Sequence, residues 1–217
     1  MSSVFQFYRR QEIWILYFFN PKLQECKDFK ESYVEIAEKL YGMIKVGAID
    51  CLNEEELCEE FSAFDVPQIM IFTEAYNDDG ERFRGEMKSG NIINAAAKKM
   101  QNFVSSVNKE NYESWTERDR ETKHKIILFT DKKATPTVFK ALSKKHIDRL
   151  NFGEIKSSEE DLIKKFGIES YPAIIALTEP EEYKGEKYEG EMSPDQLTKW
   201  VSTYAYSTPK KIVLTDF

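Results

Sequence analysis

Residues 13–27 of this chain, IWILYFFNPKLQECK, decide its fold. The first seven of them are apolar or aromatic, which is too few to span a bilayer but enough for a strand buried on both faces. Pro21 then ends the strand and pre-sets the backbone for the start of a helix. Beyond Cys26, apolar residues recur at steps of three and four, so we expect a helix with one side against a core. The residues that recur in this way are Phe29, Tyr33, Ile36, Ala37 and Leu40.

A buried strand, a turn with a proline and a helix with a cysteine near its first turn resemble the active-site segment of the protein disulfide isomerase family, in one of its thioredoxin-fold domains. That family writes the turn as Trp-Cys-x-x-Cys-Lys, and here residues 20–27, NPKLQECK, occupy it. Leu23 stands at the position of the first cysteine and Cys26 at that of the second, with Gln24 and Glu25 between them. The resemblance therefore implies a degenerate active site.

The loss of the first cysteine bears directly on activity. In the family that cysteine is exposed at the helix N-terminus, where the helix dipole favours the thiolate, and it attacks the substrate disulfide. Cys26 shares the core-facing side of its helix with Phe29 and Tyr33, so we expect it to be shielded. The family's buried carboxylate would fall at Tyr17, which is neutral at pH 7. We therefore expect no dithiol redox activity, and Cys26 is the only catalytic candidate.

Length and charge bound the other classes of function. The chain has 217 residues, of which 41% are hydrophobic and 32% charged, enough for two domains of about 100 residues. The net charge of -7 argues against nucleic acid and anionic membrane as partners. The opening residues show no signal-peptide pattern and no stretch reads as transmembrane. For a family of the secretory pathway, this suggests an expressed fragment rather than a complete precursor.

An internal repeat sets the domain organisation. Residues 82–87, RFRGEM, return as KYEGEM at 187–192, an offset of 190 - 85 = 105 residues. With one residue of slippage, residues 47–49, GAI, return as GEI at 153–155. We predict an α/β fold of two tandem thioredoxin-like domains, each a mixed sheet flanked by helices. The predicted domains are residues 1–105 and 106–207, and residues 208–217 read as a tail or the start of a further strand or domain.

Each copy is predicted to run strand, helix, strand, helix, two strands and a final helix. The predicted spans in the first copy are 13–19, 23–41, 44–50, 54–61, 68–72, 81–85 and 91–104. Those in the second copy are 126–129, 136–146, 151–155, 159–166, 173–177, 187–190 and 194–204. Residues 157–160 have the spacing of a capping box, and residues 108–125 are expected to hold a helix with Tyr112 and Trp115 inward or, alternatively, a solvated linker.

Two prolines take their meaning from the resemblance. Val66-Pro67 and Tyr171-Pro172 each stand directly before an apolar strand, where this fold places a cis proline. A cis bond would leave the preceding residue's backbone open to an extended polypeptide, so we predict a client-binding surface at these four residues. The alternative is that each proline simply starts a strand.

The other cysteines resemble a further group of relatives. The pattern Gly-Ala-Ile-Asp-Cys, ending at Cys51 and followed seven residues later by Cys58, resembles thioredoxin domains of endoplasmic-reticulum J-domain proteins. The resemblance implies a structural disulfide between the two, which leaves Cys26 free. Three buried thiols in a cytosolic chain is the alternative. The three cysteines and two histidines show no zinc-ligand spacing, and His146 is expected to be an ordinary helix-end residue.

These observations predict a redox-impaired, disulfide-isomerase-like protein that binds unfolded or partner polypeptides and assists folding in the endoplasmic reticulum lumen. The partners expected are such polypeptides and other chaperones or oxidoreductases, with no cofactor, metal, nucleic acid or membrane. One alternative is a single-thiol oxidoreductase that uses Cys26 in mixed disulfides. Others are a part of a larger J-domain co-chaperone with redox function, and a cytosolic adaptor of phosducin type.

The two ends of the chain add one more prediction. Residues 4–8 read as the helix that normally follows the first strand of this fold, so the first domain has no obvious first strand. Residues 212–214, IVL, read as a strand that follows the second domain. We predict that they pair with the edge of a thioredoxin sheet, in this chain or in a neighbour, or else form a frayed end.

Overall fold

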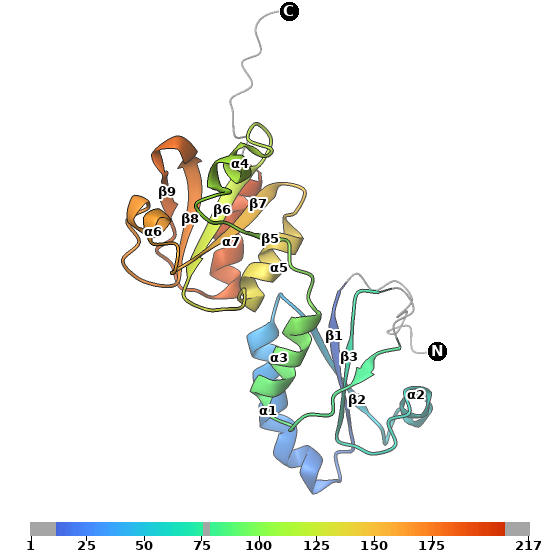
Figure 1. The fold of residues 1–217 in the computed structure, drawn as a ribbon. Coiled ribbons are helices and arrows are strands. Elements are labelled where there is room, and N and C mark those ends of the chain that lie inside the picture. The colour runs from blue at the N-terminus through green and yellow to red at the C-terminus, as the bar shows by residue number, and fades with distance from the viewer. Residues whose placement is uncertain (1–11, 76–78, 207–217) are drawn as a thin grey trace, which may run out of the picture. The chain divides into compact units, whose positions relative to one another are not determined.

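The computed structural model describes residues 12–75 and 79–206. The chain divides into two compact units, Met1–Met100 and Gln101–Phe217, and each contains one mixed sheet flanked by helices (Figure 1). The predicted α/β class with mixed sheets is therefore confirmed. Within the described ranges, no helix is long and apolar enough to cross a membrane.

The first unit is built on a four-stranded sheet in the order β2-β1-β3-β4. Strand β1 runs parallel to β2 and antiparallel to β3, and β3 pairs antiparallel with the short β4. Because β1 has a strand on each side and helices on each face, its apolar run is buried as the sequence predicts. The bounds are Trp14–Phe19 for β1, Lys45–Asp50 for β2, Gln68–Phe72 for β3 and Glu81–Arg82 for β4.

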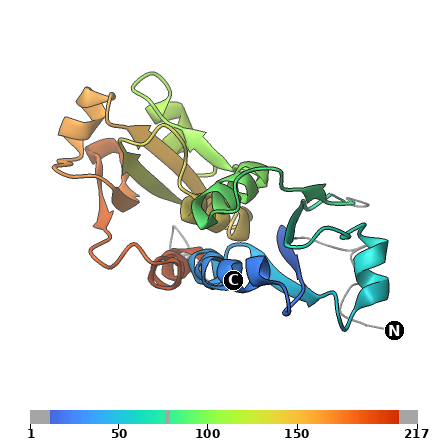
Figure 2. The same cartoon turned by 90° about the horizontal axis from the view of Figure 1, so that it is seen from below.

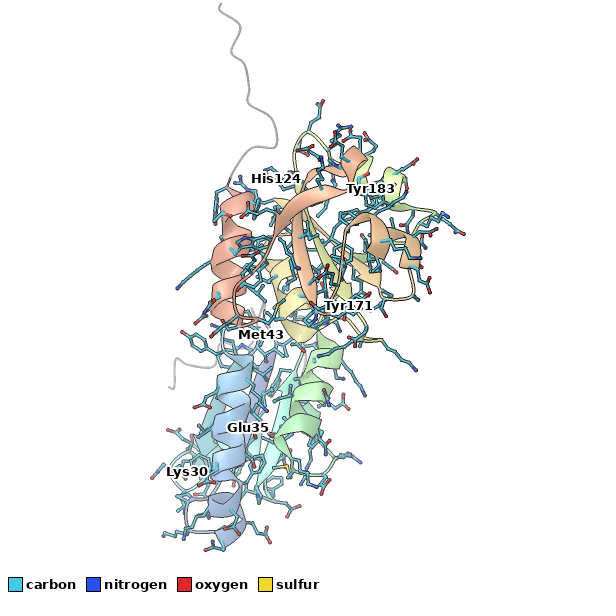
Figure 3. The ribbon with its side chains drawn as sticks, turned by 90° about the vertical axis from the view of Figure 1, so that its left-hand side faces the viewer. Lys30, Glu35, Met43, His124, Tyr171 and Tyr183 are labelled. Atoms are coloured by element: carbon cyan, nitrogen blue, oxygen red, sulfur yellow. A yellow bond between two sulfur atoms is a disulfide. The ribbon has the colours of Figure 1, made fainter. Side chains whose placement is uncertain are left out.

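Among the described residues of this unit, three helices cover the sheet. Helices α1 (Gln24–Leu40) and α3 (Ser89–Lys99) pack together on one face, while α2 (Glu55–Glu60) lies on the other (Figures 1 and 2). The predicted core stripe of α1 is buried at Phe29, Ile36 and Leu40. The side of α1 turned away from the sheet carries charged residues, among them Lys30 and Glu35 (Figure 3).

The second unit has a five-stranded sheet in the order β5-β7-β6-β8-β9. Its central strand β6 pairs parallel with β7 and antiparallel with β8, as β1 does with β2 and β3. The added strand β5 runs parallel along the outer edge of β7. The bounds are Val104–Ser106 for β5, His124–Thr130 for β6, Leu150–Lys156 for β7, Ala173–Glu179 for β8 and Lys184–Lys187 for β9.

Two hydrophobic clusters form on the two faces of this second sheet. Helices α5 (Thr137–Lys145) and α7 (Pro194–Ala205) cover one face, and α4 (Tyr112–Glu117) and α6 (Glu160–Lys165) cover the other. The predicted helix with Tyr112 and Trp115 inward is thus confirmed, since both side chains are buried. Tyr183, which follows the 3-10 turn Pro180–Glu182, stacks on Tyr112 with ring centres 4.8 Å apart (Figure 3).

Two predicted elements are displaced. The helix expected over residues 91–104 ends at Lys99, because Met100 turns extended and Val104 joins a strand beside β7. The strand expected over residues 187–190 lies at Lys184–Lys187 instead. Gly185 explains this shift, since any side chain there would collide with the backbone of β8.

The predicted capping box at residues 157–160 is wrong. Helix α6 begins at Glu160 with Glu159 as its N-cap, and no side chain caps it. The Glu159 carboxylate instead accepts a hydrogen bond from the backbone N–H of Lys109, 3.1 Å away. The expectations for residues 4–8 and 212–214 fall outside the part of the chain that the structure describes.

Candidate functional site

The turn before α1 is held by Asn20. Its side-chain oxygen accepts the Lys22 amide at 2.9 Å, and its carbonyl accepts the Leu23 amide at 3.1 Å. This Asx-type turn sets Leu23 at the N-cap of α1 with an extended backbone. The Leu23 side chain is 42% exposed, and the neighbouring Gln24 and Glu25 are exposed as well. An apolar side chain therefore occupies the helix N-terminus at which a dithiol site needs its attacking thiolate.

Cys26 lies one turn further in and is shielded from solvent. Its side chain is only 4% exposed, and its sulfur accepts the Asn20 backbone N–H at 3.4 Å. The Tyr17 hydroxyl donates to the Cys26 carbonyl at 3.3 Å. The Tyr17 ring in turn packs against Phe29 and Tyr33, with ring centres 5.3 and 4.7 Å away. The thiol therefore sits beside an aromatic core cluster, out of reach of a substrate disulfide in this conformation.

Tyr17 takes the position at which the family resemblance expects a proton-accepting carboxylate. The residue is buried, and burial raises the pKa of its phenol well above the ordinary value, with contact to Cys26 raising it further. A neutral phenol cannot accept a proton from a resolving thiol at neutral pH. At these two positions the thiol is buried and the phenol is neutral.

Cys51 and Cys58 are joined by a disulfide with an S–S distance of 2.06 Å. Cys51 follows the end of β2, where its N–H donates to the Phe19 carbonyl at 2.8 Å, and Cys58 is buried in α2. The bond therefore ties α2 to the end of the sheet. Cys26 is the remaining free cysteine.

The Val66–Pro67 and Tyr171–Pro172 peptide bonds are both cis (Tyr171 is labelled in Figure 3). Each proline directly precedes a strand, β3 in the first unit and β8 in the second. The structure therefore divides these four residues between the two units. The client surface that we place on them stays a prediction.

Several loops of the first unit meet at one end of its sheet. Phe19 pairs with Asp50, and Phe18 pairs with Gln68, so β1 and β2 end where β3 begins. The turn with Leu23, the segment after β2 and the segment before β3 all project from this end, the lower end of that sheet in Figure 1. We call it the loop end of the first unit.

Two exposed apolar side chains at the loop end escaped sequence reasoning. Leu52 is 44% exposed and Phe64 is 72% exposed, and with Leu23 they form three apolar positions open to solvent. Both lie outside the helical and strand periodicities, and an apolar residue in such a segment is the signal that could have found them. Asn20, which holds the turn, was also missed, although Asn-Pro is a known turn initiator.

The segment from residue 50 to residue 65 gives the loop end a strong negative charge. It contains seven carboxylates and neither lysine nor arginine, and the carboxylates are Asp50, Glu54, Glu55, Glu56, Glu59, Glu60 and Asp65. The matching segment of the second unit, residues 155–170, mixes four carboxylates with three lysines. The two units therefore present different electrostatic surfaces at the same place in the fold.

The second unit contains no cysteine and therefore offers no thiol chemistry. Helix α5 begins after Pro136, and the hydroxyl oxygen of Thr135 accepts a hydrogen bond from the Asn102 side chain at 3.2 Å. Across the described ranges, no group of three or more His, Cys, Asp or Glu residues is placed to hold a metal ion. His146, expected to be an ordinary helix-end residue, is buried at the end of α5 and its Nε2 has no hydrogen-bond partner among the described residues.

The mixed sheets with helices on both faces are of the thioredoxin-fold type. Residues 3–98 match the family model named Thioredoxin. Full-length ERdj5 has a similar solved structure, with a TM-score of 0.65 and 14% identity over 90% of this chain and 30% of that chain. The likeness to ERdj5 shows the fold.

The sequence relatives of this chain include protein disulfide-isomerases. The chain is 26% identical to a disulfide-isomerase-type protein of Dictyostelium discoideum, over 90% of this chain and 48% of the relative. It is 28% identical to the protein disulfide-isomerase of Humicola insolens, over 85% of this chain and 36% of that protein. The chain thus spans about half, or less, of the length of these curated relatives.

Proposed function

We propose that this chain is a redox-impaired, disulfide-isomerase-like protein that binds unfolded or partner polypeptides and assists their folding. The observation that carries the proposal is the exchange at the start of α1, where Leu23 is exposed and Cys26 is 4% exposed. A thiol must be reachable as a thiolate to attack a disulfide. Because the Cys26 thiol is buried and the apolar Leu23 side chain is exposed, the start of α1 favours non-covalent binding of a polypeptide over thiol chemistry.

The loop end of the first unit supplies the contact surface in this proposal. Leu23, Leu52 and Phe64 offer apolar side chains to a client, and burial of such groups drives polypeptide association. The carboxylates of residues 50–65 surround Leu52 and Phe64 in the sequence and attract cations. The preferred client is therefore an extended segment in which apolar residues are flanked by lysine or arginine.

The endoplasmic reticulum lumen is the proposed location. Relatives of this chain include a DnaJ homolog subfamily C member 10 of Xenopus laevis, 24% identical over 48% of this chain and 13% of that protein. The Cys51–Cys58 disulfide supports an oxidising compartment, since such bonds are rare in the cytosol. Other chaperones and oxidoreductases of that compartment are the proposed partners besides clients.

Client binding is tested by fluorescence anisotropy with an extended, labelled peptide that carries leucine and phenylalanine flanked by lysine. We expect Phe64→Ser to weaken binding at least several-fold, because it removes the most exposed apolar side chain of the loop end. Tyr41→Ser is the matched control, since Tyr41 is 69% exposed but lies at the opposite end of α1. Equal loss in the two variants, or no binding by the unmodified chain, contradicts the proposal.

Redox impairment is tested separately by insulin reduction. The unmodified chain should show no turnover above background, and Leu23→Cys should restore part of it, because the new thiol stands at the helix N-terminus. Restoration stays partial while Tyr17 replaces the carboxylate. Turnover by the unmodified chain similar to that of a dithiol isomerase, or rapid alkylation of native Cys26, favours the single-thiol oxidoreductase instead.

A further inference from the structure

Helix α2 has little stability of its own. It spans only six residues, and no side chain caps its N-terminus. A helix of that length is unstable in isolation, because its few hydrogen bonds do not offset the cost of nucleation. Its last turn carries Glu59 and Glu60 and no basic residue, so these charges oppose the helix dipole. They also repel Glu55 and Glu56, four residues earlier.

The turn that ends α2 is strained. Ser62 adopts a positive φ of 52°, which residues other than glycine disfavour. The Ser62 N–H donates to Glu59 O at 2.9 Å. The Ala63 N–H donates to Cys58 O at 2.8 Å, and the two bonds together form a Schellman motif. Phe64 is the next residue, so the position of this exposed side chain depends on the bond to Cys58.

Helix α6 of the second unit ends in the same motif without the strain. Gly167 has a φ of 62° there, at an offset of 167 - 62 = 105 residues from the serine, and glycine adopts this conformation freely. Its N–H donates to Lys164 O at 3.1 Å, and the Ile168 N–H donates to Ile163 O at 3.0 Å. Basic residues occupy the last turn, and Lys164 pairs with Glu160 at 3.8 Å. Helix α6 thus has local stabilising contacts that α2 lacks.

The disulfide gives α2 a tether that the helix itself does not provide. Cys51 is fixed at the end of β2, where its N–H donates to Phe19 O at 2.8 Å, and Cys58 is buried in α2. Leu52 directly follows Cys51 and lies inside the loop that the bond closes. Phe64 lies just beyond the turn that Cys58 anchors. Two of the three apolar positions of the loop end therefore depend on this bond.

We propose that the Cys51–Cys58 bond is a redox switch for client binding, an inference that rests on the proposed function and adds its regulation. With the bond intact, α2 is folded and the loop end binds its client. Reduction lets α2 unfold, so Leu52 and Phe64 lose their fixed positions and the client is released. The switch is separate from the degenerate site at the start of α1.

The reductant is a dithiol, such as the reduced active site of an oxidoreductase. One of its thiolates attacks the sulfur of Cys51, the more exposed of the two cysteines, and forms a mixed disulfide. The Cys51–Cys58 bond breaks, and Cys58 leaves as a thiolate that takes up a proton. The second thiol of the reductant then loses its proton and displaces Cys51, which is protonated in turn. Two electrons pass to the chain, and the reductant becomes a disulfide.

Client binding and the state of the bond are coupled in both directions. A client that binds the oxidised chain more tightly than the reduced chain must disfavour reduction by the same factor. Lysine or arginine on the client acts in this direction, since positive charge offsets the repulsion among the carboxylates of α2.

Fluorescence anisotropy with the labelled leucine, phenylalanine and lysine peptide tests the switch on the oxidised and the dithiothreitol-reduced chain. The reduced chain should bind at least several-fold more weakly, and the double variant Cys51→Ser, Cys58→Ser should match it. In buffers of reduced and oxidised dithiothreitol, saturating peptide should raise the dithiol-to-disulfide ratio at half-reduction by the same factor. Hydrogen exchange of the reduced chain should quicken most over residues 51–66 and leave β1 and α1 protected.

Variants of the strained turn show whether α2 is the element that responds. Ser62→Gly relieves the strain without a change of charge, so it should bring the ratio of oxidised to reduced affinities closer to one. Ser62→Ala is the matched control, because alanine keeps the strain and should leave the ratio unchanged. An equal response of the two variants contradicts the switch.

The remaining outcomes separate the switch from the proposed function. Equal affinity in the two redox states overturns the switch and leaves the proposed function standing. Absence of binding in both states contradicts the proposed function and the switch together. Loss of protection throughout β1 and α1 on reduction also overturns the switch, because release would then follow from unfolding of the whole unit.

Discussion

The two units use different means to hold in place the segment that follows β2 in the first unit and β7 in the second. In the first unit, the Cys51–Cys58 disulfide ties α2 to the end of β2. In the second unit, the start of α6 is held by Lys109, whose N–H donates to Glu159 at 3.1 Å and whose Nζ contacts Asp161 at 2.5 Å. One fastening is covalent, and the other is a pair of polar contacts at the surface.

The origin of Lys109 explains the difference. It lies between β5 and α4, in the segment that closes the edge of β7 and covers one face of the second sheet. The described part of the first unit has no strand or helix in the corresponding place. In the described part of the first unit, the disulfide is the constraint that ties this segment to the sheet. Surface ion pairs are individually weak, so the two fastenings should differ in strength.

The largest effect is expected from removal of the disulfide. Replacement of both Cys51 and Cys58 by serine should lower the stability of the first unit by about 2–3 kcal/mol, because the unfolded chain regains the freedom of a short closed loop. Hydrogen exchange read by mass spectrometry resolves the two units in one experiment. Faster exchange should be confined to residues 12–100.

Reduction of the unmodified protein serves as the control for this double substitution. It should reproduce the same pattern of exchange without any change of side-chain volume. Loss of protection spread equally over both units would mean that they unfold together, and the comparison between their fastenings would fail.

Two equivalent glycines, Gly153 and Gly47, extend the comparison of the two units to side-chain packing. A methyl group on Gly153 would lie 2.7 Å from the Trp115 ring and 2.8 Å from Val107, both in the segment that covers β7. Gly153→Ala should therefore destabilise the second unit by about 1–3 kcal/mol through overpacking. At Gly47 the nearest atom is the flexible end of Leu16 at 3.2 Å, so Gly47→Ala should cost the first unit less. Urea unfolding of the two variants measures both effects, and equal losses would contradict the packing argument.

These glycines also show how much of the fold can be predicted from the sequence alone. The repeat of Gly-Ala-Ile as Gly-Glu-Ile locates the second parallel strand of both units, and the structure places β2 and β7 there. Periodicity located most helices to within a residue or two of their observed bounds. It failed at Val104, because a three-residue strand such as β5 owes its existence to pairing with β7 and leaves no periodic signal.

The same distinction applies to the candidate site, where residue spacing predicts some features and not others. The position of Cys26 on the buried side of α1 follows from spacing, and the structure places the side chain there. Exposure of Phe64 and Leu52 does not follow from spacing, since both lie in segments between regular elements. The burial of His146 was missed for a related reason, because it depends on what packs over the end of α5 rather than on the helix itself.

Mild acid should lower the stability of the second unit more than that of the first, because both histidines of the chain, His124 and His146, lie in the second unit. Burial lowers the pKa of His146, and the nearby charge of Lys145 lowers it further. Below pH 6.5, His146 binds a proton in the unfolded chain but stays neutral in the folded chain. The second unit therefore loses stability as the pH falls through that region. His146→Gln should flatten this slope in thermal unfolding. His124→Gln, whose histidine pKa is also lowered by burial, should flatten it too, and an unchanged slope in the double variant would contradict the assignment.

The smallest effect is expected at the polar fastening itself. Lys109→Met removes the ion pair with Asp161 and keeps the backbone N–H that donates to Glu159. Both charged side chains are exposed, so the loss of stability should be slight at low ionic strength and should vanish in high salt. The hydrogen bond from Lys109 holds the pKa of Asp161 below its usual range, so the pair stabilises the folded state above the unfolded pKa and ceases to do so as the acid is protonated. The difference between Lys109→Met and the unmodified chain should therefore disappear in strong acid as it does in salt. A large loss that persists in both conditions would show that the lysine acts through packing of its stem, and the contrast with the disulfide would then be one of packing rather than charge.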